Sequence, residues 1–326
     1  MKDILDFGAV KNAKITILVD NRVDFLLQSN ERVDYFTKQL LLAEQGFSLL
    51  IEVCNKIIIL DCGTDSNVLL ENMRRMEIDP CSIDTVILSH GHSDHVGSVA
   101  RLLRAIKSTR KPKNWESIAD QEIYDSIKCD KLPVLIHPAA FHERWRIYKN
   151  GMTYGPLPIP NQDEWESLDA RIVSTPTPYK IDSGCWITGY IPRCMHEKQT
   201  AGTYRTVYRE DNRFVEDEIE DDQALVINVE GKGLIVITGC AHAGIVNTIN
   251  YAQRLTGVSH IYAVIGGFHL AFSSDEEVKQ SIIELDKIGI SYVVPLHCTG
   301  FCAMFEIVKL MQDKYLQGVV GATLKF

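Results

Sequence analysis

Four side chains that commonly bind metal ions lie within six residues of this 326-residue chain, in segment 90–95, which reads HGHSDH. An apolar run precedes the segment and is predicted to be a strand. Side chains at positions i and i+2 project to the same side as a chain leaves a strand, so His90 and His92 can converge on one ion. Asp94 and His95 begin the predicted helix that follows and point back toward the same end. The spacing therefore predicts two neighbouring ligand groups, as a two-metal hydrolytic site requires.

The ligand types indicate which metal such a site would take. Imidazole and carboxylate suit Zn²⁺ best, with iron or manganese as alternatives, and the pattern is compatible with one or two ions. A solvated histidine cluster without metal is disfavoured, because three crowded imidazoles would repel one another near their common pKa. We therefore interpret the segment as a metal centre in which metal-bound water attacks a substrate.

The spacing H-x-H-x-D-H resembles the signature of the metallo-β-lactamase-fold superfamily. Segment 60–63 (LDCG), with Asp61 placed 29 residues before His90, resembles that superfamily's D-x-G turn. The resemblance implies an α/β fold, a four-layer αββα sandwich, with Asp61 beneath the metal-site loop as a hydrogen-bond acceptor for a ligand. Taken alone, an ordinary turn aspartate would explain the D-x-G turn equally well.

Further motifs narrow the resemblance to one subgroup, the 7,8-dihydropterin-6-methyl-4-(β-D-ribofuranosyl)aminobenzene-5'-phosphate synthase-like proteins. Six motifs recur in the order of that subgroup: 18–21 (LVDN), 43–48 (AEQGFS), 188–193 (TGYIPR), 238–244 (TGCAHAG), 265–270 (IGGFHL) and 295–300 (PLHCTG). One departure is Tyr190, which stands where the subgroup usually has the glutamate of Gly-Glu-Ile-Pro-Arg.

The resemblance also implies the complete set of metal ligands. The two implied groups are His90, His92 and His242 for the first ion, and Asp94, His95 and His297 for the second. Asp94 is in addition the candidate catalytic group, because a carboxylate within hydrogen-bond reach of the nucleophile can orient it or hold its proton.

The bridging ligand of the superfamily is missing from this chain. The superfamily normally bridges its metals with the aspartate of a T-G-D turn, and the equivalent-looking segment 238–240 reads TGC. Cys240 as a soft ligand and His269 are the weaker candidates for its place. His269 is preferred, because Gly266 and Gly267 let the backbone approach closely. Without the bridging carboxylate, one metal is expected to bind weakly.

A basic stretch is the candidate clamp for a substrate phosphate, because guanidinium forks match phosphate oxygens. It contains Arg193, Lys198, Arg205 and Arg209. A solvated basic loop is an equally good interpretation, except for Arg193, whose Ile-Pro-Arg setting fits the subgroup motif. Thr299 and Gly300 are the other substrate-binding candidates.

Three functions are compatible with such a centre. The preferred one is a metal-dependent hydrolase of a small, phosphorylated, ester-type substrate. The second, implied by the subgroup, is a transferase that joins a dihydropterin methyl diphosphate to an arylamine ribofuranosyl phosphate, with the metals on the leaving diphosphate. The third is a non-catalytic protein that binds a metabolite and metal, and an intact metal site makes it the least favoured. Analogy of fold does not choose between these chemistries.

Alternating strand and helix patterns must position these residues. Strands are predicted at 14–20, 47–53, 56–62, 85–89, 133–137, 171–175, 185–191, 224–230, 233–238, 261–265 and 291–295. Helices are predicted at 66–76, 95–107, 244–255, 274–288 and 303–313. Ligands from both halves must meet, which predicts a single domain over 1–326, with insertions near 108–131 and 193–223. The acidic run 216–222 is predicted to be a solvated loop.

The composition is that of an ordinary globular protein. Its 34 Lys and Arg against 43 Asp and Glu give a formal charge of −9, which argues against a nucleic-acid-binding surface. The chain offers no apolar run of about 18 residues and no signal-like start, so neither a membrane span nor secretion is expected. Nine cysteines without a CxxC pair indicate a reduced, cytoplasmic chain. We expect an anionic small-molecule substrate, and the sequence indicates no oligomeric state.

Overall fold

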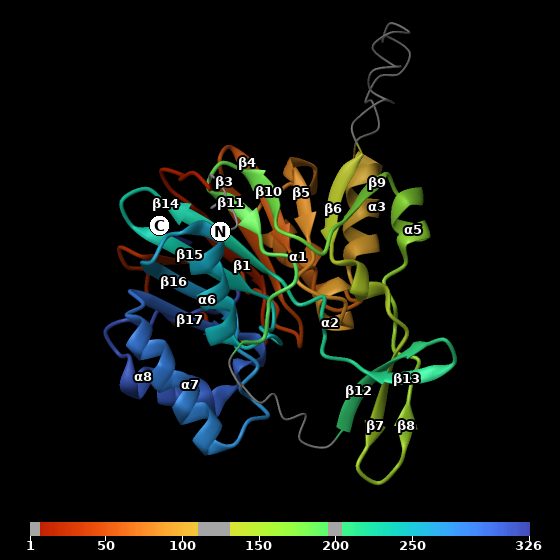
Figure 1. The fold of residues 1–326 in the computed structure, drawn as a ribbon. Helices are drawn as coiled ribbons and strands as arrows, with labels where there is room; N and C mark the ends of the chain where they lie inside the picture. Colours follow the sequence, from red (N-terminus) through yellow and green to blue (C-terminus); the bar gives the residue numbers. More distant parts are fainter. Residues whose placement is uncertain (1–6, 110–130, 195–203) are drawn as a thin grey trace, which may run out of the picture.

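A computed structural model of the chain describes residues 7–109, 131–194 and 204–326. Two large sheets face each other at its centre (Figure 1). The first has eight strands in the order β2 (Val33–Tyr35), β18 (Ala322–Lys325), β1 (Lys14–Val19), β3 (Ser48–Val53), β4 (Lys56–Leu60), β5 (Thr85–Ile87), β6 (Leu132–Ile136) and β9 (Ala170–Ser174). The second has six in the order β10 (Tyr179–Asp182), β11 (Cys185–Ile187), β14 (Ala224–Val229), β15 (Gly233–Thr238), β16 (Ile261–Gly267) and β17 (Tyr292–Leu296).

Helices cover the outer face of each sheet, which completes four layers (Figure 1). The eight-stranded sheet is accompanied by α1 (Val68–Arg75), α2 (Ser93–Val96), α3 (Val99–Thr109) and α5 (Gln162–Ser167). The six-stranded sheet carries α6 (Ile245–Thr256), α7 (Asp275–Ile288) and α8 (Phe301–Leu310). Short 3₁₀ helices lie at Pro80–Ser82, Pro138–Phe141 and His297–Thr299. This is the predicted αββα arrangement.

Strand β15 illustrates why the sequence folds into these layers. Ile235 and Ile237 pack into the core between the two sheets, whereas Leu234 and Val236 pack against the helices outside. Successive side chains of a strand point to opposite faces, so a strand covered on both faces must be apolar at every position. The continuous apolar run that predicted this strand is therefore a direct consequence of the four-layer packing.

Most predicted elements are present, with ends shifted by a few residues. The helix predicted at 95–107 is divided into α2 and α3 at Gly97, whose backbone N–H donates to the Gly63 carbonyl over 2.9 Å. A Cβ at position 97 would collide with the backbone of Thr64 and Asp65, so glycine allows this close approach. The apolar side chains of this segment are buried, at Val96, Val99, Leu102, Leu103 and Ile106.

A third sheet was not predicted, and we call it the accessory sheet. Its strands are β13 (Arg213–Glu216), β12 (Tyr204–Glu210), β7 (Arg144–Tyr148) and β8 (Thr153–Tyr154), in that order. It projects from the sandwich on one side (Figure 1). The described part of the predicted insertion at 193–223 thus contains two strands, whereas most of the insertion at 108–131 lies outside the described residues.

Within the described ranges, no helix is both long and apolar enough to cross a bilayer.

Candidate metal centre

The histidine-bearing loops meet where strands from both large sheets end. The loop of 88–92 follows β5, the loop of 239–244 follows β15, and His269 follows β16. His297 comes directly after β17 and begins a 3₁₀ turn. Ligands from both sheets are therefore brought together, as expected from predicted ligands that are spread over both halves of the chain.

The first predicted ligand group is assembled from both halves of the chain. His90, His92 and His242 place one ligand atom each within 4.8 Å of one another. The His90 Nε2 and His92 Nδ1 atoms are 3.0 Å apart, and the centroid of the His242 ring lies 4.8 Å from that of His90. Burial is the main cause that lowers the pKa of all three imidazoles, to about 4 for His92. The rings are therefore neutral at pH 7 and have lone pairs available for an ion.

The second predicted group lies beside the first. Asp94, His95 and His297 also place their ligand atoms within 4.8 Å of one another. The Asp94 Oδ2 atom is 3.4 Å from His297 Nε2. Burial opposes ionisation of Asp94, but the charge of His95 and the hydrogen bond and charge of His297 outweigh it and lower the pKa of the carboxyl. Asp94 is therefore ionised at neutral pH.

Two buried aspartates form hydrogen bonds with histidines of the second group. Asp61 accepts hydrogen bonds from His95 Nδ1 over 2.7 Å and from the Ser89 backbone N–H and hydroxyl over 2.7 and 2.6 Å. This interaction turns the other ring nitrogen of His95 toward the centre, as the resemblance implied for Asp61. Asp20, which the sequence analysis did not single out, accepts from the His297 N–H over 2.7 Å. The motif at 18–21 was the signal that could have identified it.

Cys240 takes the position between the two groups. Its Sγ atom is 3.2 Å from His95 Nε2, and it shares a potential ligand group with His90 and His95 and another with His297 and Cys298. His269 belongs to none of these groups within the described residues, although its ring stacks near that of His242. The geometry therefore favours Cys240 over His269, the reverse of the preference expected from the sequence.

The acidic run 216–222 is not the solvated loop that was predicted. Asp217 and Asp221 are buried with Arg144, whose Nε donates to Asp217 Oδ2 over 2.6 Å and whose Nη2 donates to Asp221. The other Asp221 oxygen accepts from the Gly91 N–H over 2.6 Å. Gly91 lies between two ligands, and a Cβ there would be 2.6 Å from the Ala140 carbonyl oxygen. Asp221 thus braces the first ligand loop against β7 of the accessory sheet.

Asp222 braces the second loop in the same way. Its Oδ2 accepts from the Ala243 N–H over 2.9 Å, next to His242. Burial raises the pKa of this carboxyl to about 7, although the backbone donors of Ala243 and His242 oppose the shift. The acidic run was misinterpreted because charge runs are usually solvated. Here its buried aspartates form ion pairs with Arg144 and accept hydrogen bonds from the backbone N–H groups of Gly91 and Ala243.

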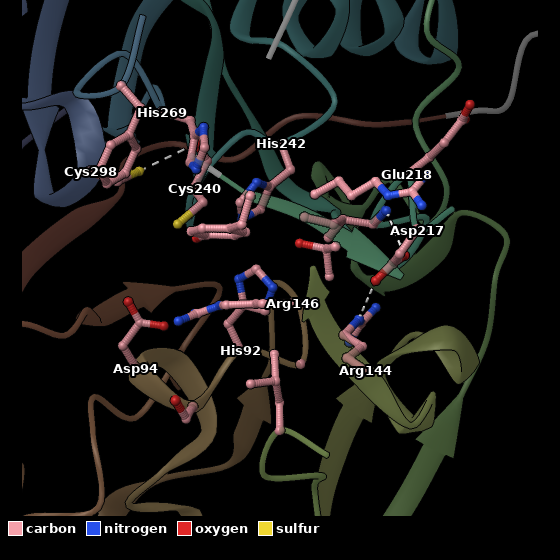
Figure 2. A pocket seen from close by; sticks show the side chains of 18 of the residues that line it. His92, Asp94, Arg144, Arg146, Asp217, Glu218, Cys240, His242, His269 and Cys298 are labelled. Atoms are coloured by element: carbon pink, nitrogen blue, oxygen red, sulfur yellow. Dashed lines mark hydrogen bonds and ion pairs between the residues drawn. The ribbon is translucent and has the colours of Figure 1, made fainter. Parts of the chain in front are cut away.

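A cavity of about 720 Å³ opens above the two ligand groups (Figure 2). The potential ligands His92, Asp94, Cys240, His242, His269, His297 and Cys298 line it. Its other walls include Arg144, Arg146, Arg193, Arg205, Glu216, Asp217, Glu218, Leu157, Pro158, Tyr204 and Phe272. Figure 2 shows Arg144 in contact with Asp217, and the Arg146 side chain directed away from Asp217.

The predicted substrate-binding residues have different positions. Arg193 lines the cavity, but its Nη2 donates to the backbone carbonyls of Glu218 and Ile219. Thr299 is buried and accepts from the Phe268 N–H over 3.0 Å, so it supports a loop and does not line the cavity. Gly300 also lies outside the cavity wall, at the start of α8, with φ of +78°.

Of the remaining described residues of the predicted phosphate clamp, only one is shown to line the cavity. Arg205 lines the cavity, whereas Arg209 donates to Asn212 Oδ1 over 2.7 Å and does not. Lys198 lies outside the described residues. Arg146, which lies in β7 and outside the basic stretch, was missed.

Comparison with known proteins identifies relatives of this chain. Residues 41–111 match the family model of the metallo-beta-lactamase superfamily. The chain is 29% identical over 331 residues to the 7,8-dihydropterin-6-methyl-4-(beta-D-ribofuranosyl)-aminobenzene-5'-phosphate synthase of Methanocaldococcus jannaschii, covering 99% of this chain and 100% of the relative. A second protein of that archaeon, MJ0448, is 30% identical over 279 residues, which are 86% of this chain and 92% of the relative.

Two solved structures share the fold. Tm1679, described as a metal-dependent hydrolase of the beta-lactamase superfamily, has a TM-score of 0.69 at 24% identity, covering 96% of this chain and 99% of that chain. The metallo-beta-lactamase fold protein YhfI from Bacillus subtilis has a TM-score of 0.53 at 14% identity, covering 97% and 100%. The fold predicted from the sequence is confirmed.

Proposed function

Because this chain belongs to the metallo-β-lactamase superfamily, we propose that it is a metal-dependent transferase that joins two phosphorylated substrates. These are a dihydropterin methyl diphosphate and an arylamine ribofuranosyl phosphate. The M. jannaschii synthase, which is related over the full length of the chain, is named after a compound in which a dihydropterin methyl part is joined to a ribofuranosyl aminobenzene phosphate. The transferase is thus preferred here over the hydrolase, whereas the sequence analysis preferred the hydrolase.

The mixed lining of the cavity is the observation that carries the proposal. A volume of about 720 Å³ is in the range of sites that enclose whole small molecules. Arginines line one wall, and Leu157, Pro158 and Phe272 add apolar surface. Two substrates that combine flat rings with phosphate groups need both kinds of surface beside the metal groups.

The ligand groups fit one or two divalent ions. Both ring nitrogens of buried His242 have no hydrogen-bond partner among the described residues, as expected of a side chain that binds an ion. The imidazoles and the carboxylate suit Zn²⁺ best, and Cys240 suits it as a soft ligand. When bound, the ions supply positive charge that stabilises the diphosphate as it leaves.

The protein's own groups position the reaction and receive its proton. The amine nitrogen forms a bond to the methylene carbon while the bond from that carbon to the diphosphate oxygen breaks. His269 lines the cavity, and burial, assisted by the charge of His297, lowers its pKa to about 4. Its neutral imidazole therefore accepts the proton that the amine loses. The ionised Asp94 carboxylate holds His297 in place.

A hydrolase of a small phosphorylated ester is the second candidate. It is favoured by the two three-residue ligand groups, because three protein ligands leave a position for water on a catalytic ion. In that reaction Asp94 would orient the water, the role that the sequence suggested for it.

Diphosphate release separates the two functions. We expect the metal-loaded protein to release diphosphate only when both substrates are present, in a one-to-one ratio with the condensed product. The measurement is an enzyme-coupled diphosphate assay with product detection by mass spectrometry. Equal release from the dihydropterin methyl diphosphate alone would contradict the transferase and support the hydrolase.

A further inference from the structure

Arg146 differs from the arginine two positions before it in the same strand. Arg144 is buried and forms ion pairs with Asp217 and Asp221. Arg146 is half-buried and lines the cavity, yet it has no hydrogen bond or acidic partner among the described residues. A partly buried cation without a counter-ion is costly, so its position favours the binding of an anion.

The guanidinium of Arg146 is held in orientation by an aromatic ring. It lies over the Tyr204 ring, 4.9 Å from the centroid. Tyr204 and Thr206 are two positions apart in β12, so their side chains lie on the same face of the accessory sheet. Arg146 lies on that face too, because it is paired with Thr206 across β12 and β7. Stacking uses the flat face of the guanidinium and leaves the N–H donors at its edge free for a bidentate contact with phosphate.

The wall that carries Arg146 is also fixed relative to the metal groups. Arg144 lies on the same face of β7 and is connected through Asp221 to the Gly91 N–H, between His90 and His92. An anion on Arg146 is therefore kept at a defined place on the cavity wall. In the view of Figure 2, the Arg146 side chain points away from Asp217.

The charges around the cavity limit where a second anion can bind. Asp217 is neutralised by Arg144, but Glu216 and Glu218 are exposed carboxylates on the same rim. Arg193 is occupied by two backbone carbonyls. A diphosphate on the metal ions would repel a second phosphate nearby. Arg146, which lines the cavity and has no such partner among the described residues, remains for that phosphate, and Arg205 also lines the cavity.

We propose that Arg146 forms a phosphate-monoester subsite on the cavity wall that binds the ribofuranosyl phosphate of the arylamine substrate. The subsite rests on the proposed function for the identity of the substrate. It determines specificity by distinguishing the phosphorylated from the unphosphorylated arylamine.

Calorimetric titration of the metal-loaded protein with two probes tests the subsite. The probes are ribose 5-phosphate and inorganic diphosphate, and the variants are Arg146→Ala, Arg146→Lys, His92→Ala and, as a matched control on the same sheet, Arg209→Ala. Loss of a charge-assisted contact predicts about tenfold to a hundredfold weaker binding of ribose 5-phosphate to Arg146→Ala. Diphosphate affinity should stay within about threefold. Arg146→Lys keeps the charge without the fork and should be intermediate.

His92→Ala should show the opposite pattern, with weakened diphosphate binding and retained ribose 5-phosphate binding. The subsite is refuted if Arg146→Ala binds ribose 5-phosphate as Arg209→Ala does, or if the wild type does not bind it. It is also refuted if Arg146→Ala loses diphosphate instead, since Arg146 would then serve the leaving group. Binding that depends on Arg146 without any condensation would refute the proposed function and leave the subsite in place.

Discussion

The floor and the wall of the cavity are built by different means. The floor consists of histidines and Asp94 at the ends of strands in both large sheets, buried or half-buried and fixed by hydrogen bonds such as that from the His297 N–H to the Asp20 carboxylate. Much of the wall is formed by the accessory sheet, which carries buried Arg144, half-buried Arg146 and exposed Arg205 and is connected to the floor through Asp221. The difference indicates that the arrangement of the ligand groups is part of the four-layer fold, whereas the proposed phosphate subsite lies on an added sheet.

The largest expected effect comes from removing a floor ligand. His92→Ala leaves two imidazoles in the first group, so we expect activity to fall more than about a hundredfold, together with loss of bound metal. Removing metal from the wild type with a chelator should have the same effect, and adding Zn²⁺ should reverse it. Elemental analysis and turnover provide the measurement. His260→Ala, at an exposed histidine, is the control. Full activity in metal-free protein would contradict the role of the floor.

The brace between floor and wall should give the next largest effect. Asp221→Asn weakens a buried ion pair with Arg144 and the acceptor for Gly91, so we expect a loss of about 3 kcal/mol in the free energy of unfolding. Activity should fall by about tenfold to a hundredfold, because supporting partners orient the ligands. Urea denaturation and kinetics check both values. Asp211→Asn, at an exposed position, is the control, and equal stability of the two variants would refute the brace.

Cys240 tests whether the floor contains a sulfur ligand. Cys240→Ala should weaken metal binding by about tenfold or more at both groups, because the thiol lies between them and shares candidate groups with residues of each. Competition with a metal indicator measures both affinities. Cys302→Ala changes an exposed cysteine and should have no effect. Unchanged metal affinities in Cys240→Ala would exclude the thiol from the metal centre.

A smaller effect is expected at the apolar part of the wall. Phe272 is 60% exposed and lines the cavity beside His269. Loss of ring stacking in Phe272→Ala should raise KM by about threefold to tenfold and leave kcat nearly unchanged. Phe305→Ala, an exposed phenylalanine outside the cavity wall, is the matched control. A fall in kcat with constant KM would assign Phe272 to the chemical step instead.

The sequence predicted the floor far better than the wall. The strands that carry the ligands are apolar runs of the kind seen in β15, because they are covered on both faces, and such runs are recognisable without the structure. The segment HGHSDH identified four of the six ligands of the two groups from spacing alone. His269 was ranked above Cys240, and the geometry reverses that order because it depends on how the loop after β16 turns.

The wall depends on partners that lie far apart in the chain. Arg144 and Asp221 are separated by 77 residues, so the acidic run had no visible partner and looked like a solvated loop. The strands of the accessory sheet are short and rich in charge, which local patterns assign to loops. Arg146 lies outside the basic stretch that was taken as the clamp, and its role depends on that sheet.

The position of the metal ions tests the account most directly. Crystals of the metal-loaded protein, with anomalous diffraction measured on both sides of the zinc absorption edge, would locate every ion. We predict one peak among His90, His92 and His242 and a second among Asp94, His95 and His297, with Cys240 between the two. Peaks at other residues, or protein that is active without any ion at these groups, would contradict the account.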